Sequence, residues 1–182
     1  AGHVVGEQIT AENLIRGLMI PSGNDSAAVV AASVVKKKEN NNNLSSDECI
    51  AEFAKIMNEK AKELGCTNSH FANPHGYHNE NHYTTARDMS IIVSAAMDNE
   101  IISEIAAEKS FSGNSLGNLK DQHPDAITNE YNWKSHNLLI AAGSEYNYEY
   151  ATGFKTGFTD EAGDCVAATA EKDGAKLIAV IC

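Results

Sequence analysis

One stretch of small and apolar residues limits what this 182-residue chain can fold into. Ser26 to Val35 reads Ser-Ala-Ala-Val-Val-Ala-Ala-Ser-Val-Val, and it follows the turn formers Ser22 to Asp25. Such a turn favours a helix start, and a helix that is apolar on nearly all sides must be covered by other elements. The sequence therefore predicts a helix in the middle of the fold, ended by lysines that begin at Lys36.

Periodic apolar residues predict four further helices. Residues 45–48 contain a capping box for one helix, Thr84-Thr85 caps another, and Pro21 and Gly65 end two of them. The expected helices cover residues 10–20, 46–64, 85–96 and 100–107. Residues 110–150 have weak periodicity, so we expect loops there with room for one short strand or helix.

The C-terminal part of the chain predicts an antiparallel sheet. The expected strands cover residues 150–159, 165–171 and 175–182. Asp173-Gly174 is typical of a two-residue hairpin loop, which sets Glu171 opposite Lys176. Both faces of the hairpin are largely apolar, so we expect the sheet to be covered on both sides.

The same hairpin register sets Cys165 opposite Cys182. A cross-strand disulfide and two buried free thiols both fit this pairing, and the sequence leaves both open. The four cysteines show no Cys-x-x-Cys spacing, so they indicate neither a zinc site nor a redox motif of that kind.

Charge and hydropathy exclude two classes of partner. The chain has 25 acidic and 14 basic side chains, and a net charge of -11 argues against binding nucleic acid or an anionic lipid surface. The longest apolar run is far shorter than the ~20 residues that span a bilayer. Any bound anion must therefore be held by a local group.

Four histidines lie near Glu80 in a loop-rich segment, and such residues could bind zinc. They are His70, His75, His78 and His82. No helical i, i+4 pair is present among them, so we interpret them as turn and surface residues and expect no metal or other cofactor.

Two triplets indicate the chemistry: Ser22-Gly23-Asn24 opens the apolar helix, and Lys155-Thr156-Gly157 lies on a predicted strand. Ser-x-x-Lys, a Ser-x-Asn triplet and Lys-Thr-Gly together mark serine acyl-transferases of the penicillin-binding and β-lactamase type. With the blocks around the triplets, the chain resembles the low-molecular-mass penicillin-binding proteins, the serine-type D-alanyl-D-alanine carboxypeptidases of the peptidase S11 family. The similar blocks, in the family's order, are residues 14–28, 57–76, 82–89 and 153–163.

The resemblance implies an α+β fold of the serine β-lactamase and penicillin-binding-protein (transpeptidase-like) type. That fold has a mainly antiparallel sheet with flanking helices and an all-helical subdomain. Residues 1–182 would form part of one catalytic domain. Residues from about 10 to 145 would lie mostly in the helical subdomain, and those from about 146 to 182 would form the last strands of the sheet.

The resemblance also implies a function. It is the removal of the terminal D-Ala from peptidoglycan stem peptides through a serine acyl-enzyme, which β-lactam antibiotics such as penicillins trap. The protein would work outside the cytoplasmic membrane without a cofactor, and it would meet the membrane only through segments absent from this chain. The alternative is a non-catalytic protein that binds β-lactams or wall peptides, or an inactive fragment.

Site residues follow from the motif positions. Lys155 and the Thr156 hydroxyl would bind the substrate carboxylate, Ser22 would relay a proton to the leaving amine, and Asn24 would bind a substrate amide. The Phe158 N–H would belong to the oxyanion hole. Ser22, Asn24 and Lys155 are thus the expected catalytic residues, and the expected substrate-binding residues are Gly23, Thr156, Gly157, Phe158 and Thr159.

The chain departs from the family at the nucleophile. The family's Ser-x-x-Lys lies upstream of its Ser-x-Asn, and the 21 residues before Ser22 do not contain that motif. The Ser-x-x-Lys from Ser33 to Lys36 is on the same predicted helix, ~16 Å from Ser22 at ~1.5 Å per residue, too far to share one carbonyl. We therefore expect a fragment, incomplete at both ends, that is inactive alone.

Overall fold

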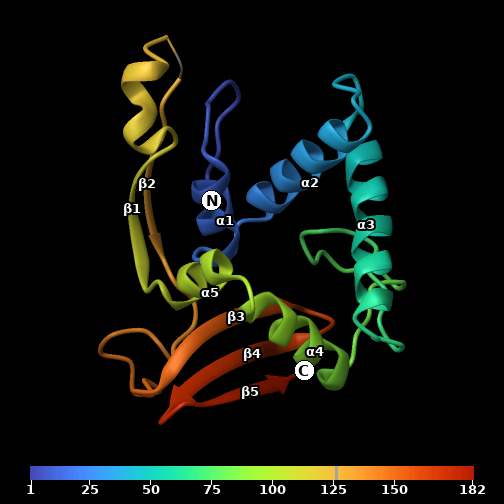
Figure 1. Cartoon of the computed structure of the whole chain (residues 1–182), viewed down its shortest axis with the longest axis vertical. Helices are drawn as coiled ribbons and strands as arrows, with labels where there is room; N and C mark the ends of the chain where they lie inside the picture. Colours follow the sequence, from blue (N-terminus) through green and yellow to red (C-terminus); the bar gives the residue numbers. More distant parts are fainter. Residues whose placement is uncertain (126) are drawn as a thin grey trace.

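The computed structural model describes residues 1–125 and 127–182, and Figure 1 shows helices on one side of a small antiparallel sheet. The helices are α1 (Ala11–Met19), α2 (Asn24–Lys38), α3 (Ser46–Glu63), α4 (Ala86–Met97) and α5 (Glu100–Ala107). The five predicted helices are confirmed to within a few residues at their ends. The strands are β1 (Ser110–Asn114), β2 (Glu130–Lys134), β3 (Ala151–Thr159), β4 (Gly163–Lys172) and β5 (Ala175–Ile181), and η1 (Gly117–Gln122) is a 3-10 helix.

The apolar helix α2 runs between α1 and α3 (Figure 1) and is covered on one side. Ala31 and Val35 are fully buried, but Val29 and Val34 are 38% and 42% exposed. The prediction of a helix covered all round is therefore wrong for the described residues. Small side chains at 27 and 31 let α2 approach its neighbours on one face, while the opposite face has no packed neighbour among the described elements.

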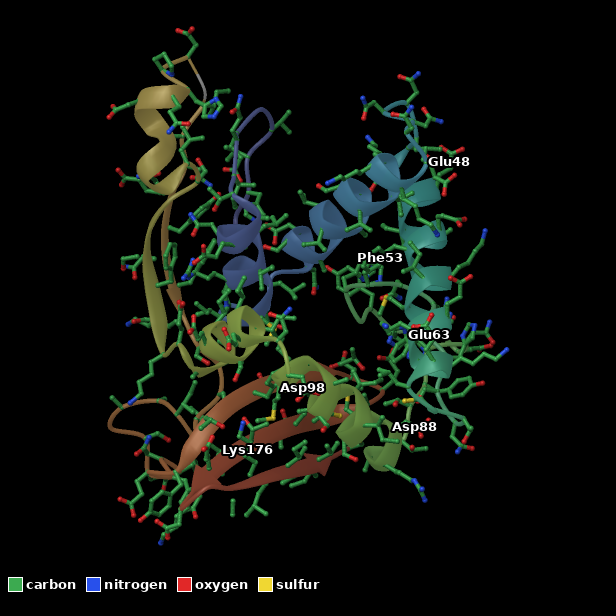
Figure 2. The ribbon with its side chains drawn as sticks, in the orientation of Figure 1. Glu48, Phe53, Glu63, Asp88, Asp98 and Lys176 are labelled. Atoms are coloured by element: carbon green, nitrogen blue, oxygen red, sulfur yellow. The ribbon has the colours of Figure 1, made fainter. Side chains whose placement is uncertain are left out.

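Helix α3 begins with a complete capping box. The Ser45 hydroxyl accepts a hydrogen bond from the Glu48 backbone N–H, and the Glu48 carboxylate accepts one from the Ser45 N–H at 2.8 Å. Glu48 and Glu63 mark the first and last turns of this helix in Figure 2. Two of the helix's unpaired N-terminal groups are thus satisfied by the pair that the sequence contains.

The loop after α3 is tied to α4 by a buried carboxylate. Asp88, in the first turn of α4 (Figure 2), is 2% exposed and accepts hydrogen bonds of 2.8 Å from the Asn68 N–H and the Ser69 hydroxyl. On the other side of the loop, Asn58 of α3 bonds both backbone groups of Phe71 at 2.8 Å. These contacts fix the path from α3 to α4.

Strands β1 and β2 form a separate two-stranded antiparallel sheet. Tyr131 and Trp133 alternate with exposed neighbours on β2, are both 5% exposed, and pack with Ile20 at the end of α1. We expected one short strand or helix in residues 110–150, but the structure has the strands β1 and β2 and the 3-10 helix η1 there. The alternation of residues 130–134 was the available signal for β2.

Strands β3, β4 and β5 form a second antiparallel sheet in that order. Glu171 pairs with Lys176 and Lys172 with Ala175, so the predicted hairpin register is confirmed. Helices α4 and α5 pack on one face of this sheet, on the side of Gly153, where a Cβ would lie 2.6 Å from the Ala106 carbonyl oxygen.

The opposite face of this sheet is open. Phe158, Leu177 and Ile181 share this face and are 65%, 67% and 62% exposed. The expectation that the sheet is covered on both sides is therefore wrong for the described residues. The strands have apolar side chains on both faces, but the described helices contact only one face.

The division of the chain near residue 145 into a helical part and a sheet part stays a prediction. No helix in the described residues is long and apolar enough to cross a membrane.

Candidate functional site

The two triplets that the sequence analysis singled out meet in the folded chain. The Lys155 ammonium on β3 donates a hydrogen bond of 2.6 Å to the Ser22 hydroxyl oxygen, just before α2. Ser22 has a left-handed backbone with φ 56°, a conformation that few residues other than glycine adopt. The chain turns sharply there, and the first residue of α2, Asn24, lies two positions on.

The surroundings of Lys155 make its ammonium more acidic than that of an exposed lysine. Burial lowers the pKa of Lys155 to about 8, from an ordinary value of 10.5. The ammonium also donates to the Thr156 carbonyl oxygen at 2.5 Å, and among the described residues it forms no ion pair with a carboxylate. A partly desolvated cation of this kind suits an anionic ligand and can exchange a proton near neutral pH.

The turn at Ser22 depends on close backbone approach. The Gly23 N–H donates to the Gly17 carbonyl oxygen of α1 at 2.9 Å. A Cβ on Gly23 would lie 2.6 Å from that same oxygen, and a Cβ on Gly17 would lie 2.5 Å from the Ser26 hydroxyl. Glycine at both positions lets α1 and α2 come together and places Ser22.

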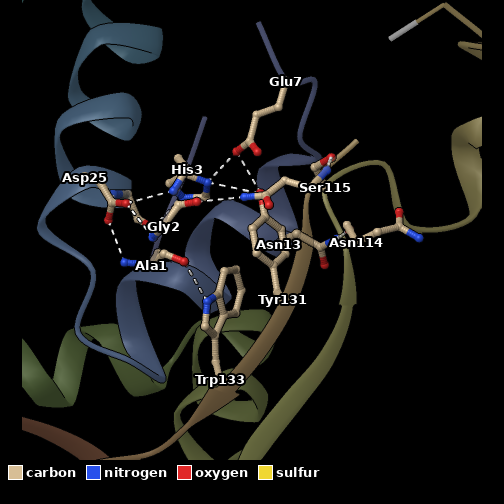
Figure 3. A network of polar contacts seen from close by, with 12 residues as sticks. Ala1, Gly2, His3, Glu7, Asn13, Asp25, Asn114, Ser115, Tyr131 and Trp133 are labelled. Atoms are coloured by element: carbon tan, nitrogen blue, oxygen red, sulfur yellow. Dashed lines mark hydrogen bonds and ion pairs between the residues drawn. The ribbon is translucent and has the colours of Figure 1, made fainter. Parts of the chain in front are cut away.

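Asp25 holds the N-terminal segment against the first turn of α2, as Figure 3 shows. Its carboxylate accepts hydrogen bonds from the backbone N–H groups of Gly2, His3 and Ser26 at 2.8, 3.0 and 2.9 Å, and from the Ala1 amino group at 2.9 Å. Burial alone would raise the pKa of Asp25, but these donors outweigh burial and the pKa is well below its usual range. The carboxylate is therefore ionised in the folded chain.

His3 joins this turn to β2. Its Nε2 lies 2.8 Å from the Ser26 hydroxyl oxygen and its Nδ1 2.5 Å from a Glu7 carboxylate oxygen. The Tyr131 hydroxyl donates to the same Glu7 oxygen at 2.7 Å (Figure 3), and burial, then Glu7, raise the pKa of Tyr131. The order Ser-His-Glu matches that of a hydrolytic triad, but Ser26 is 0% exposed. A substrate cannot reach it, so the network supports the turn.

The remaining expected site residues lie near this pair in different settings. Thr156 follows Lys155, and strand alternation turns its side chain toward the other face of β3. A Cβ on Gly157 would meet no atom within 4 Å, so the strand has open space beside it. Phe158 is 65% exposed, and the Thr159 hydroxyl accepts a hydrogen bond from the Ala162 N–H in the turn to β4.

Ser33 is exposed on α2 and is not brought to Ser22 and Lys155. It lies nine residues beyond Asn24, which is about 14 Å along the axis of a helix. In the loop that contains the four histidines, His82 Nδ1 accepts a hydrogen bond from the Ala72 N–H, so this side chain stabilises the loop itself. Across residues 1–125 and 127–182, no group of three or more His, Cys, Asp or Glu residues is placed to hold a metal ion.

The residues that support the turn at Ser22 were not among the expected site residues. Tyr131 lies more than 120 residues from His3 and Glu7, and no motif in the sequence relates it to them. Asp25 belongs to the predicted turn before α2, but its role in binding the N-terminal segment had no sequence signal.

Comparison with known proteins gives a consistent result. The Peptidase S11 family model, described as D-alanyl-D-alanine carboxypeptidase, matches residues 3–182. The D-alanyl-D-alanine carboxypeptidase DacF of Bacillus subtilis is 33% identical over 176 residues, which are 97% of this chain and 38% of that protein. A D-alanyl-D-alanine carboxypeptidase of Streptomyces sp. strain K15 is 28% identical over 98% of this chain and 56% of that protein.

A solved structure shows the same architecture. The crystal structure of the Streptomyces K15 DD-transpeptidase superimposes with a TM-score of 0.82 at 28% sequence identity, covering 98% of this chain and 62% of that one. The expected fold class, a helical part with antiparallel strands of the penicillin-binding-protein type, is confirmed. The chain spans between about two fifths and three fifths of the length of these similar proteins.

Proposed function

This chain belongs to the peptidase S11 family of D-alanyl-D-alanine carboxypeptidases, and from that membership we propose that it provides the substrate-carboxylate and proton-relay side of a carboxypeptidase active site. The reaction is removal of the terminal D-Ala from a peptidoglycan stem peptide through a serine acyl-enzyme. Because the chain spans only part of its relatives, the activity of the whole enzyme is part of the proposal.

The contact of Lys155 with Ser22 is the observation that supports this function most. A peptide that ends in D-Ala has a free carboxylate. The Lys155 ammonium is partly buried and pairs with no carboxylate within the part of the chain that the structure describes, so it is a suitable counter-ion for that group. Ser22 lies within hydrogen-bond distance of that ammonium, so a proton can pass from Lys155 through the Ser22 hydroxyl to the amine of the departing D-Ala.

The remaining steps need groups at the same place. A serine nucleophile would attack the carbonyl before the terminal residue, the bond to the D-Ala nitrogen would break, and water would later release the acyl group. Asn24 would bind a backbone amide of the peptide, and the Phe158 N–H would stabilise the oxyanion. Gly23, Thr156, Gly157 and Thr159 complete the proposed substrate-binding set. The proposal assigns the nucleophile to none of the 182 residues, because Ser33, in the Ser-x-x-Lys of this sequence, lies about 14 Å along α2 from Asn24.

The proposed partners follow from this chemistry. A β-lactam presents a carboxylate and a strained amide, so it would use the same counter-ion and trap the same serine. Wall peptides lie outside the cytoplasmic membrane, and we propose that the protein works there. Membrane association is proposed only through segments outside this sequence.

Peptide binding tests the proposed function. The purified chain is titrated with a peptide ending in D-Ala-D-Ala while backbone NMR signals are followed, and the same peptide with an amidated C-terminus is the matched control. We expect the free carboxylate to shift signals around Ser22 and Lys155 and the amide to shift them far less. Equal effects of the two peptides, or no effect from either, would contradict the proposal.

Acylation separates an enzyme from a binding protein. Intact masses of the chain are taken before and after incubation with benzylpenicillin. We expect no gain in the isolated chain, because the proposed nucleophile is elsewhere. A gain of one penicillin mass would overturn that assignment, and peptide mapping would identify the acylated serine. A persistent adduct without D-Ala release would favour the non-catalytic binding protein.

A further inference from the structure

Cys165 and Cys182 lie opposite each other when the register of β4 and β5 is continued by one pair. The paired residues run without a slip from Lys172 and Ala175 at the turn to Val166 and Ile181. The next pair in this register is Cys165 and Cys182. The structure therefore supports the register in which the two cysteines face each other.

The type of hairpin turn determines whether Cys165 and Cys182 form a hydrogen-bonded or a non-hydrogen-bonded pair. Asp173 and Gly174 have φ values of 51° and 79°, as in the two-residue loops that match strand twist. Lys172 and Ala175 flank this loop as a hydrogen-bonded pair, and hydrogen-bonded and non-hydrogen-bonded pairs alternate along the ladder. Cys165 lies an odd number of steps from Lys172, so it forms a non-hydrogen-bonded pair with Cys182.

Non-hydrogen-bonded pairs have the spacing that a disulfide needs. Their Cα atoms are about 4.5 Å apart, inside the range of about 4.4–6.8 Å found for disulfides. Both cysteines also line one cavity of about 390 Å³ between the sheet and the segment of His82 and Met89. Burial, then the nearby Cys182 thiol, raise the pKa of Cys165.

Access distinguishes this pair from the other two cysteines. Cys182 is exposed and Cys165 is partly exposed, and both are free thiols in the structure. Cys49 and Cys66 are 0% and 7% exposed, so an oxidant in solution reaches them only after unfolding. Cys165 also pairs with Gly157 on its other side, so it lies next to the strand that contains Lys155.

We propose that Cys165 and Cys182 are a redox modification site, which closes to a cross-strand disulfide when the chain meets a small disulfide oxidant of the glutathione type. The exposed Cys182 thiolate attacks the oxidant disulfide and releases one oxidant thiol, leaving a mixed disulfide. The Cys165 thiolate then attacks the Cys182 sulfur and releases the second oxidant thiol. The two cysteines lose two electrons and two protons, and the oxidant disulfide becomes two thiols.

The test uses the reduced chain and oxidised glutathione. We expect a product about 2 Da lighter, which corresponds to the two hydrogens lost, and a proteolytic peptide that joins Cys165 to Cys182. Cys49 and Cys66 should stay resistant to iodoacetamide, which shows that the chain remained folded. The oxidised chain should also melt at a higher temperature, because the bond limits the unfolded chain.

Single variants complete the design. Cys165→Ser should leave a stable glutathione adduct on Cys182, because the resolving thiol is missing. Cys182→Ser should prevent the linked peptide while leaving the melting temperature of the reduced chain nearly unchanged. The proposal is overturned if the wild-type chain accumulates glutathione adducts on both cysteines without a link, or if the linked peptide contains Cys49 or Cys66. Neither result bears on carboxylate binding at Lys155.

Discussion

The Lys155 ammonium lies 2.6 Å from the Ser22 hydroxyl oxygen, although 133 positions separate the two residues in the chain. A strand residue and a turn residue thus come together at the candidate site. The cost of holding an ammonium in this partly buried position, without a carboxylate partner among the described residues, should be measurable.

Replacing Lys155 with Met should remove peptide binding and raise stability. Burial lowers the pKa of Lys155 to about 8 in the folded chain, so the unfolded chain holds this proton more tightly. The charged group therefore opposes folding below pH 8, by at most about 3.5 kcal/mol at about 1.4 kcal/mol per pKa unit. As pH rises from 8 toward 10.5, the wild-type chain should lose this penalty and approach the variant. Denaturant unfolding of both proteins across this pH range checks the prediction, with the exposed Lys109→Met as control. A lower stability of Lys155→Met at pH 7 would contradict it.

Replacing Gly23 with Ala should disturb both stability and the site. The new Cβ would lie 2.6 Å from the Gly17 carbonyl oxygen, and backbone cannot yield as a flexible side chain does. We expect a loss of about 1–3 kcal/mol, as for overpacked cores, and weaker binding of the D-Ala-D-Ala peptide. Gly157→Ala is the matched control, because its Cβ meets no atom within 4 Å and its stability should change little. Thermal melts of the two variants check this prediction. Equal melting temperatures for Gly23→Ala and Gly157→Ala would show that α1 and α2 do not pack closely at Gly23.

Asp25→Asn should destabilise the turn and weaken its response to acid. The carboxylate accepts backbone hydrogen bonds from Gly2, His3 and Ser26, whereas an amide can turn only one acceptor oxygen toward them. We expect a loss of about 1–3 kcal/mol at pH 7. Because the pKa of Asp25 is lowered on folding, its contribution is present above the unfolded pKa of about 4 and disappears as pH falls toward the folded value. The free energy of unfolding should therefore fall less steeply with decreasing pH in the variant than in the wild-type chain. Parallel pH curves for the two proteins would refute this role.

Ser26→Ala should affect stability without affecting chemistry. The hydroxyl is fully buried and lies 2.8 Å from His3 Nε2, so its removal leaves a buried ring nitrogen without this partner. We expect a loss of about 1 kcal/mol and unchanged peptide binding. The rate of hydrolysis of an activated ester by the chain provides the second readout. If that rate falls to background in the variant, Ser26 acts as a nucleophile and the supporting role is wrong.

Local patterns predicted the parts of the fold that depend on neighbours in sequence. The Ser45 and Glu48 capping box, and the Asp173-Gly174 hairpin with its register, follow from a few adjacent residues. The apolar pattern of α2 predicted a helix, but it could not show that Val29 faces outward, because burial depends on what packs against the helix.

Part of the site was predictable for a different reason. The triplets at Ser22 and Lys155 were found through resemblance, and the structure brings the two residues together. The contacts of His3 with Ser26 and Tyr131 join three distant segments, and neither periodicity nor a motif relates such positions. The supporting network therefore needed the folded chain.

The long sequence separation between Ser22 and Lys155 also affects how the site arises during synthesis. Ser22 and α2 leave the ribosome before β3, because Lys155 follows Ser22 by 133 positions. Contacts between such distant positions also require the closure of a long loop, which slows folding. A nascent chain that ends before β3 lacks Lys155 and cannot form its contact with Ser22. The candidate site therefore forms only after β3 has been made.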